Sequence, residues 1–262
     1  MQERGKLSVQ DRICRYVENC PAAWKDITLH HLLTHSSGIF NYTALPNFAT
    51  HSQEPHTVAQ LIARFRDQEL QFTPGAKSSY SNSGYLLLGH VIERVSGKPY
   101  DAYLQVNIFR PLGLKHTGYE KEGDGVPNRA QGYVKGPQGM QEAPYLHMSV
   151  PFAAGALYST PQDLVRWNRL LHGGKLLSPE SLRAMTTPHQ DAAGYGLFID
   201  RHDNRKRIHH GGNINGFENY VSYYPDQKVC VIVMSNQARI GGHDMNQEVA
   251  NLWFGKKPKD SE

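Results

Sequence analysis

FTPGAKSSYSNSGYLLLGHVIERVSG, residues 72–97, is the stretch of sequence that decides the fold. Its first half contains a turn-forming Pro-Gly pair, and its second half has apolar residues at helical spacing from Gly84 to Val95. The turn therefore delivers Tyr80 and Asn82 just ahead of a buried helix, and we expect both side chains to project the same way from this rigid element. Taken alone, a Tyr-x-Asn tripeptide is a weak signal, because tyrosine packs and asparagine caps helices in most proteins.

The rest of the chain shows no repeat and no linker, so we predict that residues 1–262 form a single domain. Residues 27–190 are predicted to be mainly helical, and residues 191–255 to form antiparallel strands and a C-terminal helix. Helix starts are predicted at Thr28 before Leu29–Thr34, at the capping box of Thr57 and Gln60 before Leu61–Phe65, and at the Thr-Pro and Ser-Pro pairs that begin at Thr160 and Ser178.

Strand signals appear only late in the chain. They cover Tyr195–Ile199, Lys206–His210, Phe217–Tyr224 and Val229–Ser235, before a helix at about Met245–Phe254. Residues 229–234 are apolar at every position, which favours a central strand with both faces buried. Sequence order leaves this strand last, so we expect its outer edge to lack a partner and to need cover from elsewhere.

The charge distribution excludes a nucleic-acid partner. A net charge of +4 arises from 28 basic and 24 acidic residues spread along the chain, without the basic stripe that phosphate backbones require. We interpret the basic tail, Lys256, Lys257 and Lys259, as a solvated terminus.

The three cysteines, Cys14, Cys20 and Cys230, are odd in number and have no metal-ligand spacing. We therefore predict neither a disulfide framework nor a zinc finger. No apolar stretch approaches the roughly 20 residues that span a bilayer, and the first residues are not a signal sequence, so this chain has no predicted membrane segment.

Residues 72–97 as a whole resemble the second motif of the β-lactamase, D-alanyl-D-alanine carboxypeptidase and esterase superfamily. The likeness includes the Tyr-Ser-Asn, the Pro-Gly before it and the Gly-Tyr-x-Leu-Leu-Gly after it. Ile27–Ile39 resembles the family's helix-and-turn segment, and Pro151–Leu164 resembles its glycine-containing loop leading into a helix. His209–Phe217 resembles the third motif, which appears as Lys-Thr-Gly or His-x-Gly. Because these motifs occur in the right order, the sequence is identified as a member of this family of serine hydrolases.

The resemblance implies an α/β, β-lactamase-like fold: an antiparallel sheet flanked by helices, plus a mainly helical region. It also implies acyl transfer on amide, peptide or ester bonds through an acyl-enzyme, with a small-molecule or peptide substrate and no cofactor or metal. Histidine in place of lysine in the third motif favours peptidase or esterase chemistry over a dedicated β-lactamase.

The resemblance assigns roles to four residues. Tyr80 would be the phenolate or proton relay that assists the nucleophile and protonates the leaving group, and Asn82 would hydrogen-bond the acyl-side amide of the substrate. His210 would lend positive or hydrogen-bonding character near the leaving group and the substrate carboxylate. The strand carrying Gly212 would present a backbone amide, one half of an oxyanion hole.

The double histidine of the third motif allows two alignments. Aligning His-Gly-Gly-x-Ile-Asn-Gly-Phe selects His210 with Gly212, whereas aligning His-x-Gly from the first histidine selects His209 with Gly211. Since side chains alternate along a strand, only one histidine can face the cleft. We favour His210.

The family's first motif, Ser-x-x-Lys, is missing, because no serine here has a lysine three residues later. In the family that serine forms the acyl-enzyme. Gln2–Asp11 resembles the segment that follows the nucleophile helix, so we expect the nucleophile and the N-terminal strands upstream of Met1. Ser36 and Ser37 belong to a turn and Ser81 has neighbours that point elsewhere, so none is expected to replace it. Without the lysine, a tyrosine of pKa about 10 lacks its main cation, and this chain alone is predicted to be inactive or impaired.

Two other hypotheses remain. The chain could be a catalytically inactive homologue that keeps the cleft for a peptide or acyl ligand. A metal-dependent hydrolase is the other, since His31 and His35 stand one helical turn apart among 14 histidines; no zincin glutamate separates them and no third ligand is apparent. The oligomeric state is open, as is a periplasmic or extracellular location for a longer parent.

Overall fold

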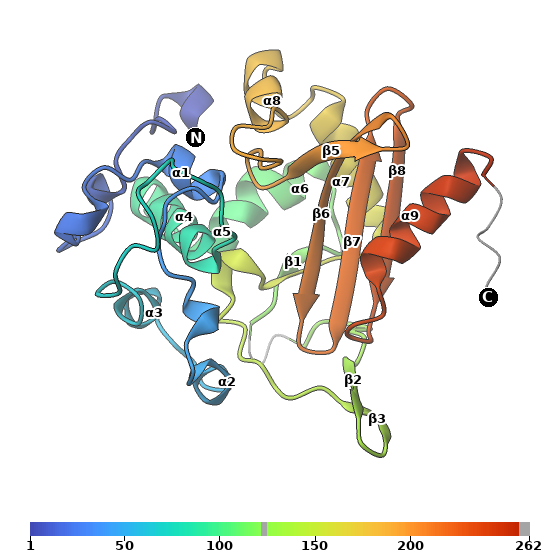
Figure 1. The fold of residues 1–262 in the computed structure, drawn as a ribbon, viewed down its shortest axis with the longest axis horizontal. Coiled ribbons are helices and arrows are strands. Elements are labelled where there is room, and N and C mark those ends of the chain that lie inside the picture. Colours follow the sequence, from blue (N-terminus) through green and yellow to red (C-terminus); the bar gives the residue numbers. More distant parts are fainter. Residues whose placement is uncertain (122–124, 257–262) are drawn as a thin grey trace.

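The structure is a computed structural model that describes residues 1–121 and 125–256, so Lys257 and Lys259 of the basic tail lie outside the described residues. A mainly helical half stands beside a four-stranded sheet, and the C-terminal helix lies across the outer face of that sheet (Figure 1). Within the described ranges, no helix combines the length and the apolar character that a bilayer crossing demands.

The helical half contains most of the secondary structure before residue 190. Its helices are α1 (Leu29–Leu33), α2 (Phe48–His51), α3 (Val58–Ala63), α4 (Asn82–Ser96), α5 (Tyr100–Leu104), α6 (Arg110–Leu112), α7 (Pro161–His172) and α8 (Pro179–Met185), with a π-helical turn at Gln105–Phe109. The predicted capping box is confirmed: Thr57 accepts from the amide of Gln60, and the Gln60 side chain accepts from the amide of Thr57.

Helix α4 forms the centre of the larger core. Its inner face buries Leu86, Leu87 and Val91, each at most 1% exposed, and it ends at Gly97, whose φ of 66° is the left-handed conformation that glycine adopts most easily. Gly89 makes a close contact, because a Cβ there would lie 2.6 Å from the ring of Phe152. The helix therefore packs directly against the 3₁₀ turn Phe152–Ala154.

The four predicted late strands form one antiparallel sheet in the order β5-β6-β7-β8. Strands β7 (Phe217–Tyr224) and β8 (Val229–Ser235) have the predicted bounds, and β6 (Arg205–Ile214) is longer than predicted. Strand β5 begins three residues later than predicted and covers Phe198–His202, because Gly196 has a φ of 71° and interrupts the extended chain. Four short strands were missed: β1 (Gly118–Tyr119), β2 (Tyr133–Gly136), β3 (Gly139–Glu142) and β4 (Leu157–Tyr158).

Helices cover both faces of the sheet. On one face, α9 (Gly242–Trp253) packs on β7 and β8, and the buried hydroxyl of Ser222 donates to Oδ1 of Asn246 at 2.6 Å. On the other face, the ring of His172 in α7 stacks on Tyr223 with centroids 4.1 Å apart. This double cover explains why β8 is apolar at both inward and outward positions.

Strand β8 is an edge strand, so the prediction of a central position is wrong, whereas the expected unpaired edge is confirmed. It pairs with β7 from Glu218↔Ser235 to Tyr224↔Val229. Within residues 1–121 and 125–256 no strand pairs with its other side.

The sequence analysis predicted no disulfide framework and did not anticipate the single disulfide that joins Cys14 and Cys20. The 3₁₀ turn Ile13–Arg15 folds this short segment back on itself, and the two Cα atoms lie 5.2 Å apart. An odd number of cysteines did not exclude one local pair. Cys230 remains free, and burial raises the pKa of its thiol to about 11.

Reducing the disulfide is expected to lower the free energy of unfolding by about 2 kcal/mol, the loop-closure value for so short a loop. Urea titration with and without a reductant measures this shift. The double variant Cys14→Ser/Cys20→Ser should match the reduced protein and ignore the reductant, and Cys230→Ser should still respond to it. An unchanged urea midpoint on reduction would contradict the prediction.

Candidate functional site

A cavity of about 790 Å³ lies between the helical half and strand β6. Tyr80, Asn82, His210 and Gly212, the four residues to which the motifs assign roles, all line it. Apolar side chains make up much of the remaining wall, among them Tyr42, Phe48, Leu146, Phe198 and Ile214. An apolar cavity with a few convergent polar groups is the usual form of a small-ligand site.

The loop before α4 is held in place by hydrogen bonds to residues 35–43. The amide of Ser81 donates to Nδ1 of His35 at 3.2 Å, and the amide of Asn82 donates to Oδ1 of Asn41 at 3.2 Å. The side-chain Nδ2 of Asn82 donates to Oγ1 of Thr43 at 3.3 Å. These bonds fix the Asn82 side chain at the cavity wall, as a substrate-binding amide requires.

His35 has a role that the sequence analysis missed, since it supports Tyr80. The His35 ring packs against the Tyr80 ring with centroids 4.4 Å apart, and His35 is only 5% exposed. Burial lowers the pKa of His35 to about 4, so its ring is neutral at pH 7 and Nδ1 can accept the Ser81 amide hydrogen. The sequence pattern that could have indicated this role is the position of His35, between the end of α1 and the turn Ser36-Ser37-Gly38.

His31 and His35 do not stand on one helix face as the metal hypothesis supposed. Helix α1 ends at Leu33, and His35 adopts a left-handed φ of 55°. Nδ1 of His31 accepts from the amide of Thr28 as part of the helix cap. Among the residues that the structure describes, no three potential metal ligands come together.

The register of β6 places His210 toward the cavity. His210 pairs with Val221, whereas His209 pairs with Ser222, so the two histidines point to opposite faces. The His210 ring lies 6.2 Å from the Tyr80 ring and 5.5 Å from the Phe198 ring, centroid to centroid. Burial lowers the pKa of His210, so at pH 7 it is a neutral hydrogen-bonding group.

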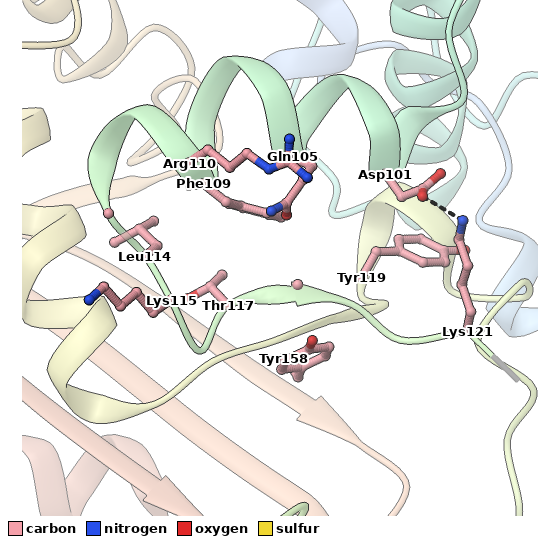
Figure 2. Close-up of a pocket in the computed structure, with 12 residues that line it drawn as sticks. Asp101, Gln105, Phe109, Arg110, Leu114, Lys115, Thr117, Tyr119, Lys121 and Tyr158 are labelled. Atoms are coloured by element: carbon pink, nitrogen blue, oxygen red, sulfur yellow. Dashed lines mark ion pairs between the residues drawn. The ribbon is translucent and has the colours of Figure 1, made fainter. Parts of the chain in front are cut away.

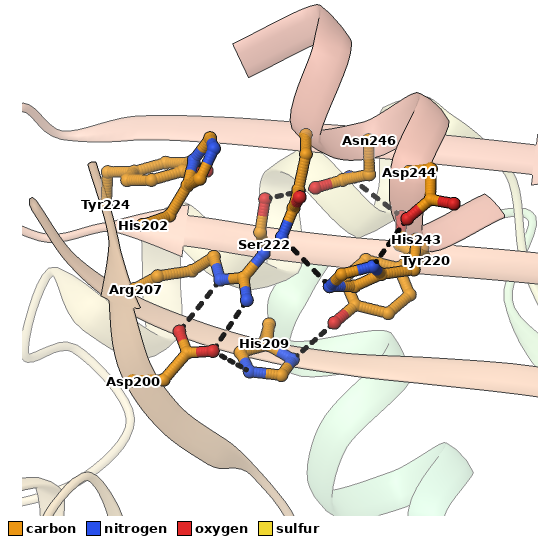
Figure 3. Close-up of polar contacts among 11 residues, drawn as sticks. Asp200, His202, Arg207, His209, Tyr220, Ser222, Tyr224, His243, Asp244 and Asn246 are labelled. Carbon is orange, nitrogen blue, oxygen red and sulfur yellow. Dashed lines mark hydrogen bonds and ion pairs between the residues drawn. The ribbon is translucent and has the colours of Figure 1, made fainter. Parts of the chain in front are cut away.

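His209 belongs to a polar network on the α9 face of the sheet (Figure 3). Its Nδ1 lies 2.6 Å from the Tyr220 hydroxyl, and Arg207, beside it on β6, donates to both carboxylate oxygens of Asp200 at 2.8 and 2.6 Å. Although burial raises the pKa of Asp200, Arg207 and His209 outweigh it and leave that pKa lowered. The network fastens β6 to β5 and β7 directly behind His210.

Part of β6 offers an unpaired edge to the cavity. Strand β5 pairs with β6 only as far as Phe198↔His209, so within the described ranges residues 210–214 have no strand on that side. A Cβ added at Gly212 would meet nothing within 4 Å. Backbone donors and acceptors along this edge are therefore accessible to a ligand in the cavity.

Tyr80 is a protonated phenol at neutral pH. Burial raises its pKa, and the described lining of the cavity includes no lysine or arginine to lower it. That lining includes no serine or cysteine either. Ser36, Ser37 and Ser81 are at most 4% exposed. The hydroxyls of Ser36 and Ser37 bond to Thr34 Oγ1 and the Ile39 amide, and the Ser81 hydroxyl donates to the Ile39 carbonyl.

The chain resembles proteins of one family along nearly its whole length. Residues 1–251 match the family model described as Beta-lactamase. The chain is 31% identical to a putative penicillin-binding protein PbpX of Bacillus subtilis over 96% of this chain and 62% of that protein. It is 30% identical to a putative D-alanyl-D-alanine carboxypeptidase of Escherichia coli over 75% of this chain and 53% of that protein.

A D-stereospecific amidohydrolase from a Streptomyces species has a similar solved structure. Its TM-score is 0.87 at 28% identity, with 98% of this chain and 82% of that one covered. The chain spans just over half the length of the two curated relatives above. The chain belongs to the beta-lactamase family.

Proposed function

We propose that this cavity is the acyl-transfer site of a serine hydrolase acting on amide, peptide or ester bonds, with the serine supplied by residues outside this sequence. One observation carries the proposal: the start of α4 and the unpaired edge of β6 place Tyr80, Asn82, His210 and Gly212 on one cavity. These groups come from segments more than a hundred residues apart, and they match the acid, amide-binding and oxyanion roles of the family motifs.

The protonation states set the proposed roles. Tyr80 acts as a hydrogen-bond donor and general acid, because its pKa is raised by burial. Asn82 binds the acyl-side amide of the substrate, and the edge of β6 bonds the substrate main chain as an added strand. The backbone amide near Gly212 contributes to an oxyanion hole.

The charge of the wall supports an amide, peptide or ester substrate over an anionic β-lactam. Glu218 lines the cavity, and the described lining includes no lysine or arginine that would bind a substrate carboxylate. Neutral His210 offers a hydrogen bond only. Two relatives are named for D-alanyl-D-alanine carboxypeptidase and D-stereospecific amidohydrolase activity, so we propose D-aminoacyl amides and peptides as the first substrates to assay.

The Cys14–Cys20 disulfide supports a parent protein that works outside the cytoplasm. Disulfides persist in oxidising compartments such as the periplasm and the extracellular space. The proposed D-aminoacyl substrates would then have to occur in the periplasm or in the extracellular space.

A fluorescent penicillin tests the proposal and separates it from the ligand-binding alternative. The 262-residue chain is expected to bind the probe reversibly and weakly, since the described wall offers its carboxylate no cation, and to show no label after denaturing electrophoresis. Fluorescence anisotropy measures the reversible binding. A parent polypeptide that carries Ser-x-x-Lys upstream should be labelled covalently. An unlabelled parent that still binds would favour an inactive ligand-binding homologue.

Asn82→Ala is expected to weaken reversible binding of a D-alanyl peptide about fivefold, because it removes a hydrogen bond worth about 1 kcal/mol. The control is Gln162→Ala, a loss of a side-chain amide at an exposed position of α7, which should leave affinity unchanged. Equal losses in both variants, or a covalent label on any of these residues, would contradict the proposal.

A further inference from the structure

A second cavity, of about 570 Å³, lies away from the family motifs. Figure 2 shows it between a helical segment, which carries Asp101, Gln105 and Arg110, and an opposite wall that carries Tyr119 and Tyr158. Its volume is within the range of small-molecule sites. None of the residues that line it lines the first cavity.

The wall of this second cavity is cationic. Arg110, Lys115 and Lys121 line it against a single carboxylate, Asp101. Lys121 pairs with that carboxylate, with Nζ and Oδ2 2.5 Å apart. Neither Arg110 nor Lys115 has an ion pair in the part of the chain that the structure describes. An anion entering the cavity would therefore meet two uncompensated positive side chains.

Polar groups without protein partners also face the cavity. The Tyr158 hydroxyl and the Gln105 side-chain amide have no hydrogen bond to any described residue. The Tyr158 ring can lie where it does because residue 118 is glycine: a Cβ there would be 2.5 Å from its hydroxyl oxygen. Tyr119 and Phe109 add aromatic surface, and aromatic rings pack well against the C–H faces of sugars and polyols.

The helical wall has an irregular backbone where it meets the cavity. Residues Gln105–Phe109 form a π-helical turn between α5 and α6. Such turns are rare and occur frequently at functional sites. Here the turn begins at Gln105 and is followed directly by Arg110, two of the side chains that line the cavity.

One two-stranded ribbon separates the two cavities. Strand β4 pairs with β1 through Gly118↔Tyr158 and Tyr119↔Leu157. Leu157 lines the first cavity and Tyr158 lines the second, because successive residues of a strand point to opposite faces. A ligand in the second cavity would therefore contact the same strand that forms a wall of the first.

We propose that the second cavity is a binding site for an anionic sugar or polyol, carrying a phosphate or a carboxylate. Arg110 and Lys115 bind the anionic group, and Gln105 and the Tyr158 hydroxyl bind ligand hydroxyls. This site is distinct from the acyl-transfer site proposed above and does not depend on a nucleophile.

Calorimetric titration with glucose 6-phosphate, glucuronate, glucose and inorganic phosphate tests the proposal. We expect saturable binding of one or both sugar anions, weaker binding of phosphate alone and none of glucose. Arg110→Gln should weaken binding at least about tenfold, and Tyr158→Phe, which keeps the ring, by a few-fold. Arg183→Gln, the same charge change at an exposed position of α8, should leave binding unchanged.

Three results would overturn the proposal: no sugar anion binding up to about 10 mM, equal affinity in wild type and Arg110→Gln, or phosphate binding as tightly as its sugar ester. The fluorescent penicillin and Asn82→Ala separate this site from the first. Sugar-anion binding that is displaced by the penicillin, or lost in Asn82→Ala, would place the ligand in the first cavity and refute a second site.

Discussion

At pH 4 the protein is expected to be far less stable than at pH 7, because one buried and two partly buried histidines resist protonation in the folded state. Burial lowers the pKa of His35, His172 and His209 to about 4 each, from 6.5 in an exposed histidine. Between pH 6.5 and 4 the unfolded chain therefore binds protons that the folded chain does not, and stability falls as pH falls through that window. The lowered pKa of Asp200 acts in the same direction at the acid end.

The expected loss is large. One pKa unit corresponds to about 1.4 kcal/mol, so the buried His35 contributes on the order of 3 kcal/mol once the pH is below 4. His172 and His209 are partly exposed and contribute less, because solvent screens their charge. The sum is a large part of the total stability of an ordinary domain, about 5–15 kcal/mol.

Urea midpoints at pH 7, 6, 5 and 4 measure this loss. His172→Phe keeps an aromatic ring against Tyr223 and should reduce the pH dependence, because it removes one of the three titrating rings. His51→Gln, at an exposed position, is the control and should leave the pH dependence close to that of the wild type. A free energy of unfolding that stays constant from pH 7 to pH 4 would refute the prediction.

Asp200→Asn is expected to destabilise the protein by about 3 kcal/mol, because it leaves a buried guanidinium without its counter-charge. Arg207 is 3% exposed, and both of its donor contacts to Asp200 are short. This expected loss of stability lies at the lower end of the range for a broken buried ion pair. The Asp200 side chain is 35% exposed, so water partly screens its interaction with Arg207.

Asp203→Asn is the matched control. Its carboxylate pairs with Arg205 and Lys256, whose side chains are 28% and 47% exposed, and its removal should destabilise the protein far less than Asp200→Asn, because solvent screens exposed ion pairs. The double variant Asp200→Leu/Arg207→Met should recover much of the lost stability, because it removes both charges together. Equal destabilisation by Asp200→Asn and Asp203→Asn would show that burial of Arg207 is not the cause.

Strong periodicity made the long elements predictable from sequence. Strands β7 and β8 were predicted to the residue, and the core of α4 was predicted because its apolar spacing spans about three turns. The short strands were not, since β3 is exposed at all four positions and so shows no alternation. Strand β5 was misplaced because the left-handed φ of Gly196 is a backbone property without a pattern in the neighbouring side chains.

The candidate site also has one part that could be predicted from sequence and another that could not. Tyr80, Asn82, His210 and Gly212 could be named from sequence because each belongs to a contiguous motif, and all four line one cavity; their roles stay predictions. His35 was missed because its contact with Tyr80 joins residues that are 45 positions apart. The choice between His209 and His210 needed the register of β6 against β7, which depends on pairing between strands.

Helix α4 packs closely on the core because Gly89 has no side chain. Gly89 lies seven residues after Asn82, about 10 Å along the helix axis at 1.5 Å per residue. Any larger residue at position 89 would press on Phe152 and shift the helix, and with it the amide and phenol at its start. The geometry of the cavity therefore depends on an interior glycine that does not line it.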